Sequence, residues 1–357
     1  LRSTREKLSG GGQPSGPLSF LRVYDSIAGV IKSGGKTRRA AKMNTLRVEH
    51  PDIKEFIQAK SHEERKAWAL IEQGYDGDFN GEAYASVAFQ NENLTVRLSD
   101  AFLEAVEQDR DWQTRLITDP SQPGPTYRAR DLMRWIAEGA WLCGDPGVQY
   151  EDTIQRWHTC KSAGPIRSSN PCSEFMFLDD TACNLASLNL MKFLQPDGTF
   201  DTDRFRSAVE VLITAQEILV DHASYPTDNI ALRSHRYRPL GLGYANLGAL
   251  IMAAGKPYDS DEGRALAAVI TAVMHLHAYP QSARLARCLG PFSAYADNRG
   301  SMREVLQRHV EALDEIGPEA PEDLRRVAAE CGRAALEAGE EAGYRNSQVT
   351  VLAPTGT

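Results

Sequence analysis

The stretch Ser169-Asn-Pro-Cys-Ser-Glu174 is the most informative part of this sequence, and the rest is interpreted outward from it. The stretch 169–174 has neither helical nor strand periodicity, so it is predicted to be an irregular loop. Pro171 biases the residue before it towards an extended backbone, in which residues two apart lie on the same face. Asn170, Cys172 and Glu174 are therefore predicted to project together, with an amide, a thiol and a carboxylate within reach of one ligand.

The chemistry of this trio favours hydrogen-atom transfer over nucleophilic attack. A neighbouring carboxylate raises the pKa of a thiol, so Cys172 beside Glu174 is poorly suited to act as a thiolate. A sulfur radical does not need the anion. Taken alone, however, Cys172 has a commoner explanation as a buried cysteine in a proline turn, because free cysteine is among the most buried residue types.

The composition is that of a globular protein without a nucleic-acid or membrane partner. The 357 residues contain 40 Lys and Arg against 48 Asp and Glu, a formal net charge of −8, and 42% are hydrophobic. This length suits one large or two ordinary domains, and the acidic balance argues against a dedicated nucleic-acid binder. The most apolar run, 240–255, is interrupted and shorter than the ~20 apolar residues of a membrane span. The first thirty residues show no signal-peptide pattern, so we expect a cytoplasmic location.

The cysteines indicate neither a disulfide scaffold nor a metal site. There are six (Cys143, Cys160, Cys172, Cys183, Cys288 and Cys331), and none is in Cys-x-x-Cys spacing. Trp157-His-Thr-Cys160 is a candidate for a metal or a catalytic base. We interpret it as a packed structural loop, because a His and a Cys two residues apart make a poor ligand set.

Strands alternate with helices along the chain, which indicates an α/β fold. A doubly wound sheet and a barrel are both compatible with this pattern. Helices are predicted over 17–31, 50–60, 63–72, from Ser99 onward, and over 132–142, 203–223, 240–254, 262–287 and 318–342; strands are predicted over 43–48, 84–89 and 347–352.

The last residues have a pattern that α/β folds use to bind phosphate. The strand predicted over 347–352 runs into Ala353-Pro-Thr-Gly-Thr357, a turn that suits the start of a helix. Because the sequence stops where that helix should begin, and starts at Leu1 in mid-pattern, we expect it to be an internal fragment of a longer protein.

Longer motifs resemble one known family. Asn170–Glu174, together with Asp179-Asp-Thr-Ala-Cys-Asn-Leu-Ala-Ser-Leu-Asn-Leu190, resembles the active-site segment of ribonucleotide reductases, most closely the adenosylcobalamin-dependent (class II) enzymes of the dimeric, diphosphate-reducing type. Five further segments resemble the same family in the same order: GGKTRRAAKMNTLRVEHPDIKEFI (34–57), FQNENLTVRLSDAFL (89–103), GDPGVQYEDTIQRWHTC (144–160), RPLGLGYANLGALIM (238–252) and NSQVTVLAPTGT (346–357).

The resemblance implies a ten-stranded α/β barrel, built from two five-stranded parallel halves, with a central finger loop. Residues 1–357 would form part of one catalytic barrel domain, incomplete at both ends in this chain. Within it, 17–110 would contribute the effector and specificity loops, and 164–190 the finger loop and the strand that follows.

The same resemblance implies catalytic roles. Cys172 would carry the thiyl radical that removes the ribose 3′ hydrogen, Glu174 would be the base for the 3′-OH proton, and Asn170 would bind the ribose hydroxyls. Cys183 would be one of two cysteines that reduce the substrate and end as a disulfide. Its partner would belong to a motif upstream of Leu1.

Binding roles follow from motif position as well. The turn Ala353, Pro354, Thr355, Gly356 and Thr357 would hold the substrate phosphates, and Gly11 and Gly12 would line the same pocket, although they are equally explained as turn formers. The basic loop Lys36, Thr37, Arg38 and Arg39, together with the loop containing Gln90 and Asn91, would bind the allosteric deoxynucleotide and relay its identity. The solvated-loop explanation is equally open for both loops.

The family implies adenosylcobalamin as cofactor, a ribonucleoside diphosphate as substrate, a deoxynucleoside triphosphate as effector, a thioredoxin-like reductant and a homodimer. Two alternatives stay open: the large subunit of a metal-radical (class I) reductase, and a catalytically inactive nucleotide-binding fragment. We expect the isolated chain 1–357 to be inactive and marginally stable.

Overall fold

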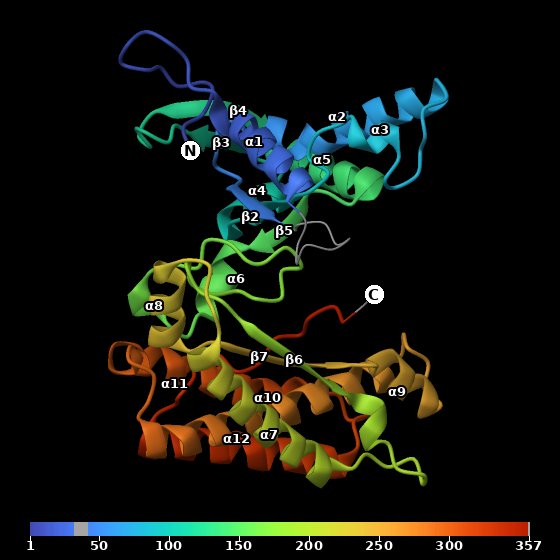
Figure 1. Cartoon of the computed structure of the whole chain (residues 1–357), viewed down its shortest axis with the longest axis vertical. Helices are drawn as coiled ribbons and strands as arrows, with labels where there is room; N and C mark the ends of the chain where they lie inside the picture. Colours follow the sequence, from blue (N-terminus) through green and yellow to red (C-terminus); the bar gives the residue numbers. More distant parts are fainter. Residues whose placement is uncertain (32–41, 356–357) are drawn as a thin grey trace. The chain divides into compact units, whose positions relative to one another are not determined.

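The computed structural model describes residues 1–31 and 42–355, and the chain divides into two compact units (Figure 1). The first unit comprises Leu1–Gln155 and Ser168–Pro171, and the second comprises Arg156–Arg167 and Cys172–Thr357. Each unit has its own cluster of buried apolar side chains.

The first unit is built on a three-stranded parallel sheet in the order β1-β2-β5. The central strand β2 (Asn93–Leu98) is buried at all but its first residue, because it has a hydrogen-bonded strand on each side and helices pack over the sheet. Its neighbours are β1 (Met43–Arg47) and β5 (Gly147–Tyr150). The remaining elements are α1 (Gly16–Val30), α2 (Ile53–Glu72), α3 (Glu82–Ala85), α4 (Asp100–Glu107), the antiparallel hairpin β3 (Asp111–Arg115) and β4 (Pro123–Arg128), α5 (Ala129–Cys143) and α6 (Glu151–Arg156).

Helix α1 buries only one narrow side. Leu21 and Asp25 are buried, whereas the opposite side exposes Phe20, Val23 and Val30, the last at 81%. The helical spacing of the apolar residues thus produces two apolar sides rather than one. Such an uncovered apolar surface is typical of an interaction site.

The second unit places long helices against two parallel strands. Strand β6 (Asn184–Asn189) pairs with β7 (Leu240–Ala245), and α7 (Thr202–His222) packs on both. Helix α10 (Asp261–Leu289) lies along α7 and α12 (Glu322–Ala342), as Figure 1 shows. The remaining elements are the 3₁₀ turns 161–163, 190–193 and 312–315, α8 (Asp228–Tyr237), α9 (Leu247–Ala253) and α11 (Tyr295–Glu311).

The segment after α12 returns to lie beside β7. Leu242 forms a parallel bridge with Thr350, and Val351 N donates to Leu242 O at 3.0 Å. The strand predicted over 347–352 is present only as this short pairing. Glycine makes the close approach possible, since a Cβ on Gly243 would stand 2.4 Å from the Val351 carbonyl oxygen.

The α/β class is confirmed, but the ten-stranded barrel is not seen. The described residues form separate sheets of three, two and two strands, with no closed barrel among them. In the same described part, no helix is both long and apolar enough to cross a membrane.

Three element predictions are wrong in instructive ways. The predicted strand 84–89 contains the end of α3 and a loop, and the strand of this region is β2, which begins four residues after Phe89. The predicted helix 240–254 is strand β7 followed by α9, separated at Asn246 with φ 65°, because a strand buried on both faces has the same continuous apolar pattern as a buried helix. The helices predicted over 50–60 and 63–72 are one helix, α2.

Candidate functional site

The loop around Cys172 is irregular, as predicted, but its backbone is not extended. Pro171 and Cys172 form a turn, and Ser173 has φ 65°, in the left-handed region. Proline fixes the φ value that suits the second position of a turn, which explains why the extended prediction for this stretch is wrong. Cys172 is exposed. Asn170 belongs to the first unit while Cys172 and Glu174 belong to the second, so their convergence stays a prediction.

Glu174 lines a cavity of about 570 Å³ in the second unit. Its Oε2 atom is buried and has no hydrogen-bond partner within the described part of the chain. Other residues on the cavity wall include Trp157, His158, His275, Tyr279 and Thr350. A buried carboxylate oxygen without a donor is costly, so it is a site where a ligand's hydroxyl or amine would be bound favourably.

Cys183 lies just before β6 and within electrostatic range of Glu174. Burial and, to a smaller extent, the negative charge of Glu174 together raise the pKa of the Cys183 thiol to about 12. Cys183 is therefore held as a neutral thiol. The space for its sulfur depends on a glycine of β7, because a Cβ on Gly241 would stand 2.4 Å from Cys183 Sγ.

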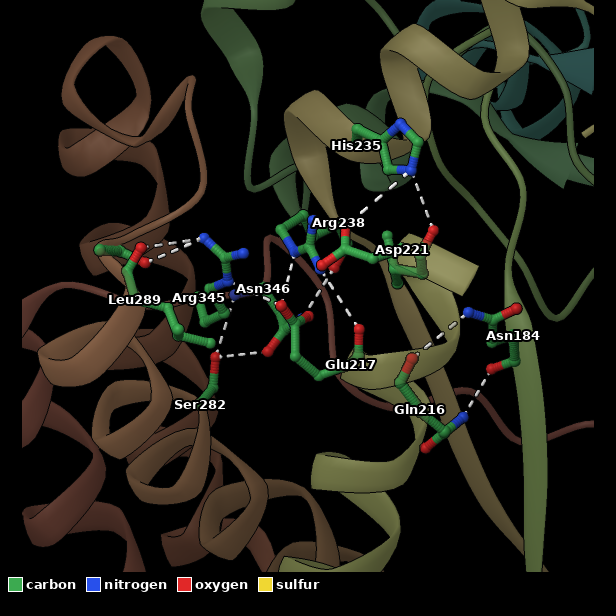
Figure 2. Close-up of polar contacts among 12 residues, drawn as sticks. Asn184, Gln216, Glu217, Asp221, His235, Arg238, Ser282, Leu289, Arg345 and Asn346 are labelled. Atoms are coloured by element: carbon green, nitrogen blue, oxygen red, sulfur yellow. Dashed lines mark hydrogen bonds and ion pairs between the residues drawn. The ribbon is translucent and has the colours of Figure 1, made fainter. Parts of the chain in front are cut away.

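Helix α7 fixes the residue that follows Cys183. Gln216 Nε2 donates to the Asn184 carbonyl oxygen at 2.6 Å, and Asn184 Nδ2 donates to the Gln216 carbonyl oxygen at 3.4 Å (Figure 2). This reciprocal pair holds the start of β6 against α7, and with it the backbone next to Cys183.

The next residue of α7, Glu217, is the centre of a buried polar network (Figure 2). Its Oε1 accepts from Arg238 Nε and Arg345 Nε, both at 2.6 Å, and its Oε2 accepts from Asn346 Nδ2 at 2.6 Å. Arg238 also binds the exposed Asp221. Glu217 thereby connects α7 to Arg238, two residues before β7, and to the start of the segment that leads to Ala353.

The structure describes only some of the residues that are predicted to bind phosphate. Thr355 Oγ1 donates to the Tyr244 carbonyl oxygen at 3.4 Å, whereas Gly356 and Thr357 lie outside the described residues. Gly11 and Gly12 belong to the first unit and form an exposed turn closed by hydrogen bonds to Leu8. The turn-forming explanation accounts for this geometry, and the binding role of all these residues stays a prediction.

The Trp157–Cys160 cluster is a packed structural loop, as predicted. His158 Nε2 donates to the Gly164 carbonyl oxygen at 3.0 Å, while its Nδ1 accepts from Cys160 N at 3.3 Å. Cys160 is fully buried. With both ring nitrogens occupied by backbone groups, His158 is not available as a ligand or base.

Two histidines of this unit, His158 and His309, are held neutral, which predicts an acid-sensitive fold. Burial lowers the pKa of His158 and of His309 to about 4. The unfolded chain takes up these protons near pH 6.5, so it binds more protons than the folded chain between about pH 6.5 and 4. The free energy of unfolding should be constant above that window and fall as the pH decreases through it, on the order of 3 kcal/mol per histidine.

Urea unfolding between pH 7.5 and 4.5 measures this slope. His309→Phe should reduce it, because this substitution removes one of these two neutral histidines. A slope that does not respond to His309→Phe would contradict the assignment.

The loop that contains Gln90 and Asn91 borders a second cavity, of about 530 Å³, in the first unit. Both residues line it, together with Arg22, Asp25 and Gly29 of α1. The other predicted effector loop, Lys36–Arg39, lies outside the described residues.

No group of three or more His, Cys, Asp or Glu side chains able to hold a metal ion occurs in residues 1–31 and 42–355. One cluster resembles a cysteine–histidine–carboxylate triad: Cys331 Sγ lies 3.7 Å from His277 Nδ1, and His277 Nε2 lies 2.9 Å from Glu210 Oε1. Cys331 is 2% exposed, and burial raises the pKa of its thiol to about 11, so it is not an accessible nucleophile.

The sequence analysis did not identify two buried carboxylates, Asp25 and Glu217. Asp25 could have been identified, since it is a charged residue four positions after Leu21 on the buried side of α1. Glu217 could not have been identified, because an acidic residue in a long amphipathic helix is ordinarily solvated. Only its partners, distant in sequence, reveal its role.

Comparisons with known proteins identify the family of the chain. A family model described as "Ribonucleotide reductase, barrel domain" matches residues 1–357. The chain is 61% identical to a protein of Rhodopirellula baltica and 47% identical to one of Streptomyces avermitilis, both named vitamin B12-dependent ribonucleotide reductase, and the matches cover 100% of the chain. It is 34% identical, over 98% of its length, to a vitamin B12-dependent ribonucleoside-diphosphate reductase of Mycobacterium tuberculosis. The chain spans 34%, 38% and 41% of these relatives' lengths. By its match over the whole length to the barrel-domain model, the chain belongs to the ribonucleotide reductase family.

Proposed function

We propose that this chain is the catalytic part of an enzyme that reduces ribonucleoside diphosphates to 2′-deoxyribonucleoside diphosphates by thiyl-radical chemistry. The observation that carries the proposal is the pairing of Glu174 with Cys183. Glu174 lines a cavity and its buried Oε2 has no hydrogen-bond partner among the described residues, and Cys183 is a thiol kept protonated within range of its charge. A base and a hydrogen-donating thiol are what the reduction of a sugar hydroxyl requires.

Each residue has a defined part in the reaction. The Cys172 sulfur radical takes the hydrogen atom from C3′, forming S–H and leaving the radical on C3′. Glu174 accepts the 3′-OH proton, and Asn170 orients the hydroxyls through hydrogen bonds. The 2′-OH leaves as water with one hydrogen from the thiol pair, and the second thiol hydrogen goes to C2′. Glu174 then returns its proton to the 3′ oxygen, and Cys172 returns its hydrogen atom to C3′, which restores the sulfur radical.

Cys183 and a second thiol supply the two electrons and hydrogens and become a disulfide. The high pKa of Cys183 suits this role, because a thiol that is still protonated has the hydrogen to donate. A thioredoxin-like dithiol then reduces the disulfide for the next turnover.

We propose adenosylcobalamin as the cofactor, in keeping with the names of the relatives. The exposure of the Cys172 thiol agrees with this cofactor, because a group as bulky as a cobalamin can approach a sulfur only at the surface of the unit. Cys172 is the residue of this chain that would face it. When bound, adenosylcobalamin supplies the organic radical that oxidises the thiol.

The substrate and effector assignments rest on position. Ala353–Thr357 would bind the substrate diphosphate, with Gly11 and Gly12 as further contacts, and the diphosphate form agrees with the name of the Mycobacterium tuberculosis relative. Lys36–Arg39, Gln90 and Asn91 would bind a deoxynucleoside triphosphate, for which the cavity of about 530 Å³ beside Gln90 offers space.

We also propose a homodimer and a cytoplasmic location. The exposed apolar side of α1, with Phe20, Val23, Ile27 and Val30, would pack against a second copy. All six cysteines are unpaired, as suits a reducing compartment.

Turnover of the full-length enzyme tests the function. With CDP, adenosylcobalamin and a dithiol, we expect dCDP without any second subunit, and no dCDP when the cobalamin is omitted. Product that requires an added metal-containing subunit would instead support a class I large subunit. Nucleotide binding without any product would support the inactive fragment, which is the result we expect for residues 1–357 alone.

A further inference from the structure

The carbonyl oxygen of Asn184 is an acceptor that two side chains share. Cys183 Sγ donates to it at 3.8 Å, and Gln216 Nε2 donates to it at 2.6 Å (Figure 2). Because a thiol is a weak hydrogen-bond donor, the bond from the amide is the stronger of the two and fixes the direction of this carbonyl. The orientation of the Cys183 S–H group therefore depends on the Gln216 side chain.

Gln216 is not the residue that packing alone would favour at its position on α7. It is 2% exposed, and its Oε1 is buried without a hydrogen-bond partner among the described residues. A buried amide oxygen without a donor destabilises the folded state, whereas a methionine would fill a similar space without such an oxygen. The amide donor of Gln216 is used next to Cys183, and that contact explains the glutamine where packing does not.

Strand β7 limits the position of the Cys183 sulfur as well. A Cβ on Gly241 would stand 2.4 Å from Cys183 Sγ, 2.8 Å from Leu185 Cδ2 and 2.9 Å from Val351 Cγ2. A methyl group there would have to move the sulfur or its neighbours, because packed interiors have no spare room. Gly241 does not have a positive φ, so its backbone accepts alanine and only the methyl group would matter. Gly241 thus sets a boundary of the space in which the thiol lies.

We propose that Gln216 and Gly241 are positioning residues that hold the Cys183 thiol in place for hydrogen transfer to the substrate. This inference rests on the proposed function. In that reaction Cys183 and the second thiol each lose one hydrogen and join in a disulfide. The substrate gains both hydrogens, one in the water that leaves and one on C2′. A misplacement of about 1 Å can slow a reaction about 10²-fold, so the contacts that hold this sulfur set the rate of the transfer.

The first test is Gln216→Met in the full-length enzyme, assayed for dCDP formation with adenosylcobalamin and a dithiol. Methionine keeps the length of the side chain and removes the amide, so kcat should fall at least about tenfold while the KM for CDP stays within about threefold. The midpoint of thermal unfolding should stay within about 3 °C, because the unpartnered Oε1 is removed together with the donor. Gln281→Met is the matched control and should keep the wild-type kcat, since Gln281 Nε2 also donates to α7, but to Thr214 Oγ1 at 2.8 Å.

The second test is Gly241→Ala, which changes the space for the sulfur and leaves the amide in place. Its kcat should also fall at least about tenfold, with the KM for CDP within about threefold. The double variant with Gln216→Met should lose less than the product of the two single losses, because both substitutions act on one sulfur. Gly248→Ala is the control, since the nearest atom to a Cβ there is Tyr258 Cε2 at 3.6 Å, an ordinary contact.

The possible failures are distinguishable. Wild-type kcat in either variant would overturn the positioning role of that residue and leave the proposed function intact. A raised KM with an unchanged kcat would overturn it as well, because the residue would then act on substrate binding. A wild-type enzyme that forms no dCDP, or a Cys183→Ser variant that keeps full activity, would overturn the proposed chemistry and this inference together.

Discussion

Replacing Cys172 by Ser in the full-length enzyme is expected to abolish nucleotide reduction, with turnover reduced about 10⁴-fold or more, the scale on which loss of a covalently acting catalytic group operates. A hydroxyl group occupies nearly the same space as the thiol, but its O–H bond is too strong for the hydrogen-atom exchange proposed for Cys172. The measurement is the rate of dCDP formation with adenosylcobalamin and dithiol present.

Because Cys172 is exposed, the loss of activity can be separated from a loss of folding or of nucleotide binding. A surface position tolerates the substitution, so CDP and effector Kd values should stay within a few-fold of the wild-type values. Cys288→Ser is the matched control, because Cys288 is also exposed and lies on α10 without a proposed role. Retention of more than about 1% of activity by Cys172→Ser would remove Cys172 from the mechanism.

Replacing Glu217 by Ala should lower the free energy of unfolding by roughly 3–5 kcal/mol, the usual cost of removing one partner from a buried ionic network. The substitution removes the acceptor of Arg345 Nε and one of the two acceptors of Asn346 Nδ2, which keeps the Arg238 carbonyl oxygen. Arg345 then keeps only backbone carbonyl oxygens, and Arg238 keeps Asp221 and a backbone oxygen. Denaturant unfolding of the full-length enzyme measures the loss as a shift of the midpoint at constant slope.

Asp221→Ala provides the comparison on the same helix and the same arginine. Asp221 binds Arg238 at 2.7 Å but is 53% exposed, so its removal should cost less than about 1 kcal/mol. Equal effects of the two substitutions would show that burial does not set the strength of this network. A small effect of Glu217→Ala would mean that water or side-chain rearrangement replaces the lost acceptor.

Part of the fold could be derived from local pattern. The helices from Ser99 and over 262–287 occur within a few residues of their predicted bounds, because Ser99 and Ser260 accept hydrogen bonds from the first turns of α4 and α10. The helix 240–254 could not be derived correctly, since only pairing with β6 shows that 240–245 is a strand.

The candidate site, too, could be predicted only in part from the sequence. The residue types of Asn170, Cys172 and Glu174 suggested the chemistry, but the geometry derived for them failed at Ser173, where the left-handed backbone depends on context that the sequence pattern does not contain. Likewise, burial and the nearby charge of Glu174 raise the pKa of Cys183, and Gly241 leaves the space that its sulfur occupies.

The amino-acid sequence by itself determined the family of this protein and the residues able to carry its chemistry, because motif identity and side-chain type are properties of the chain. Only the tertiary structure decided which charges are buried and what holds the site in place. The partners of Glu217 lie 21 to 129 positions away along the chain. Those of Asp25 lie 64 to 66 positions away, and those of Glu63 lie 3 to 41 positions away. These three are ordinary helix residues in the sequence, and only burial with such partners makes them structurally important.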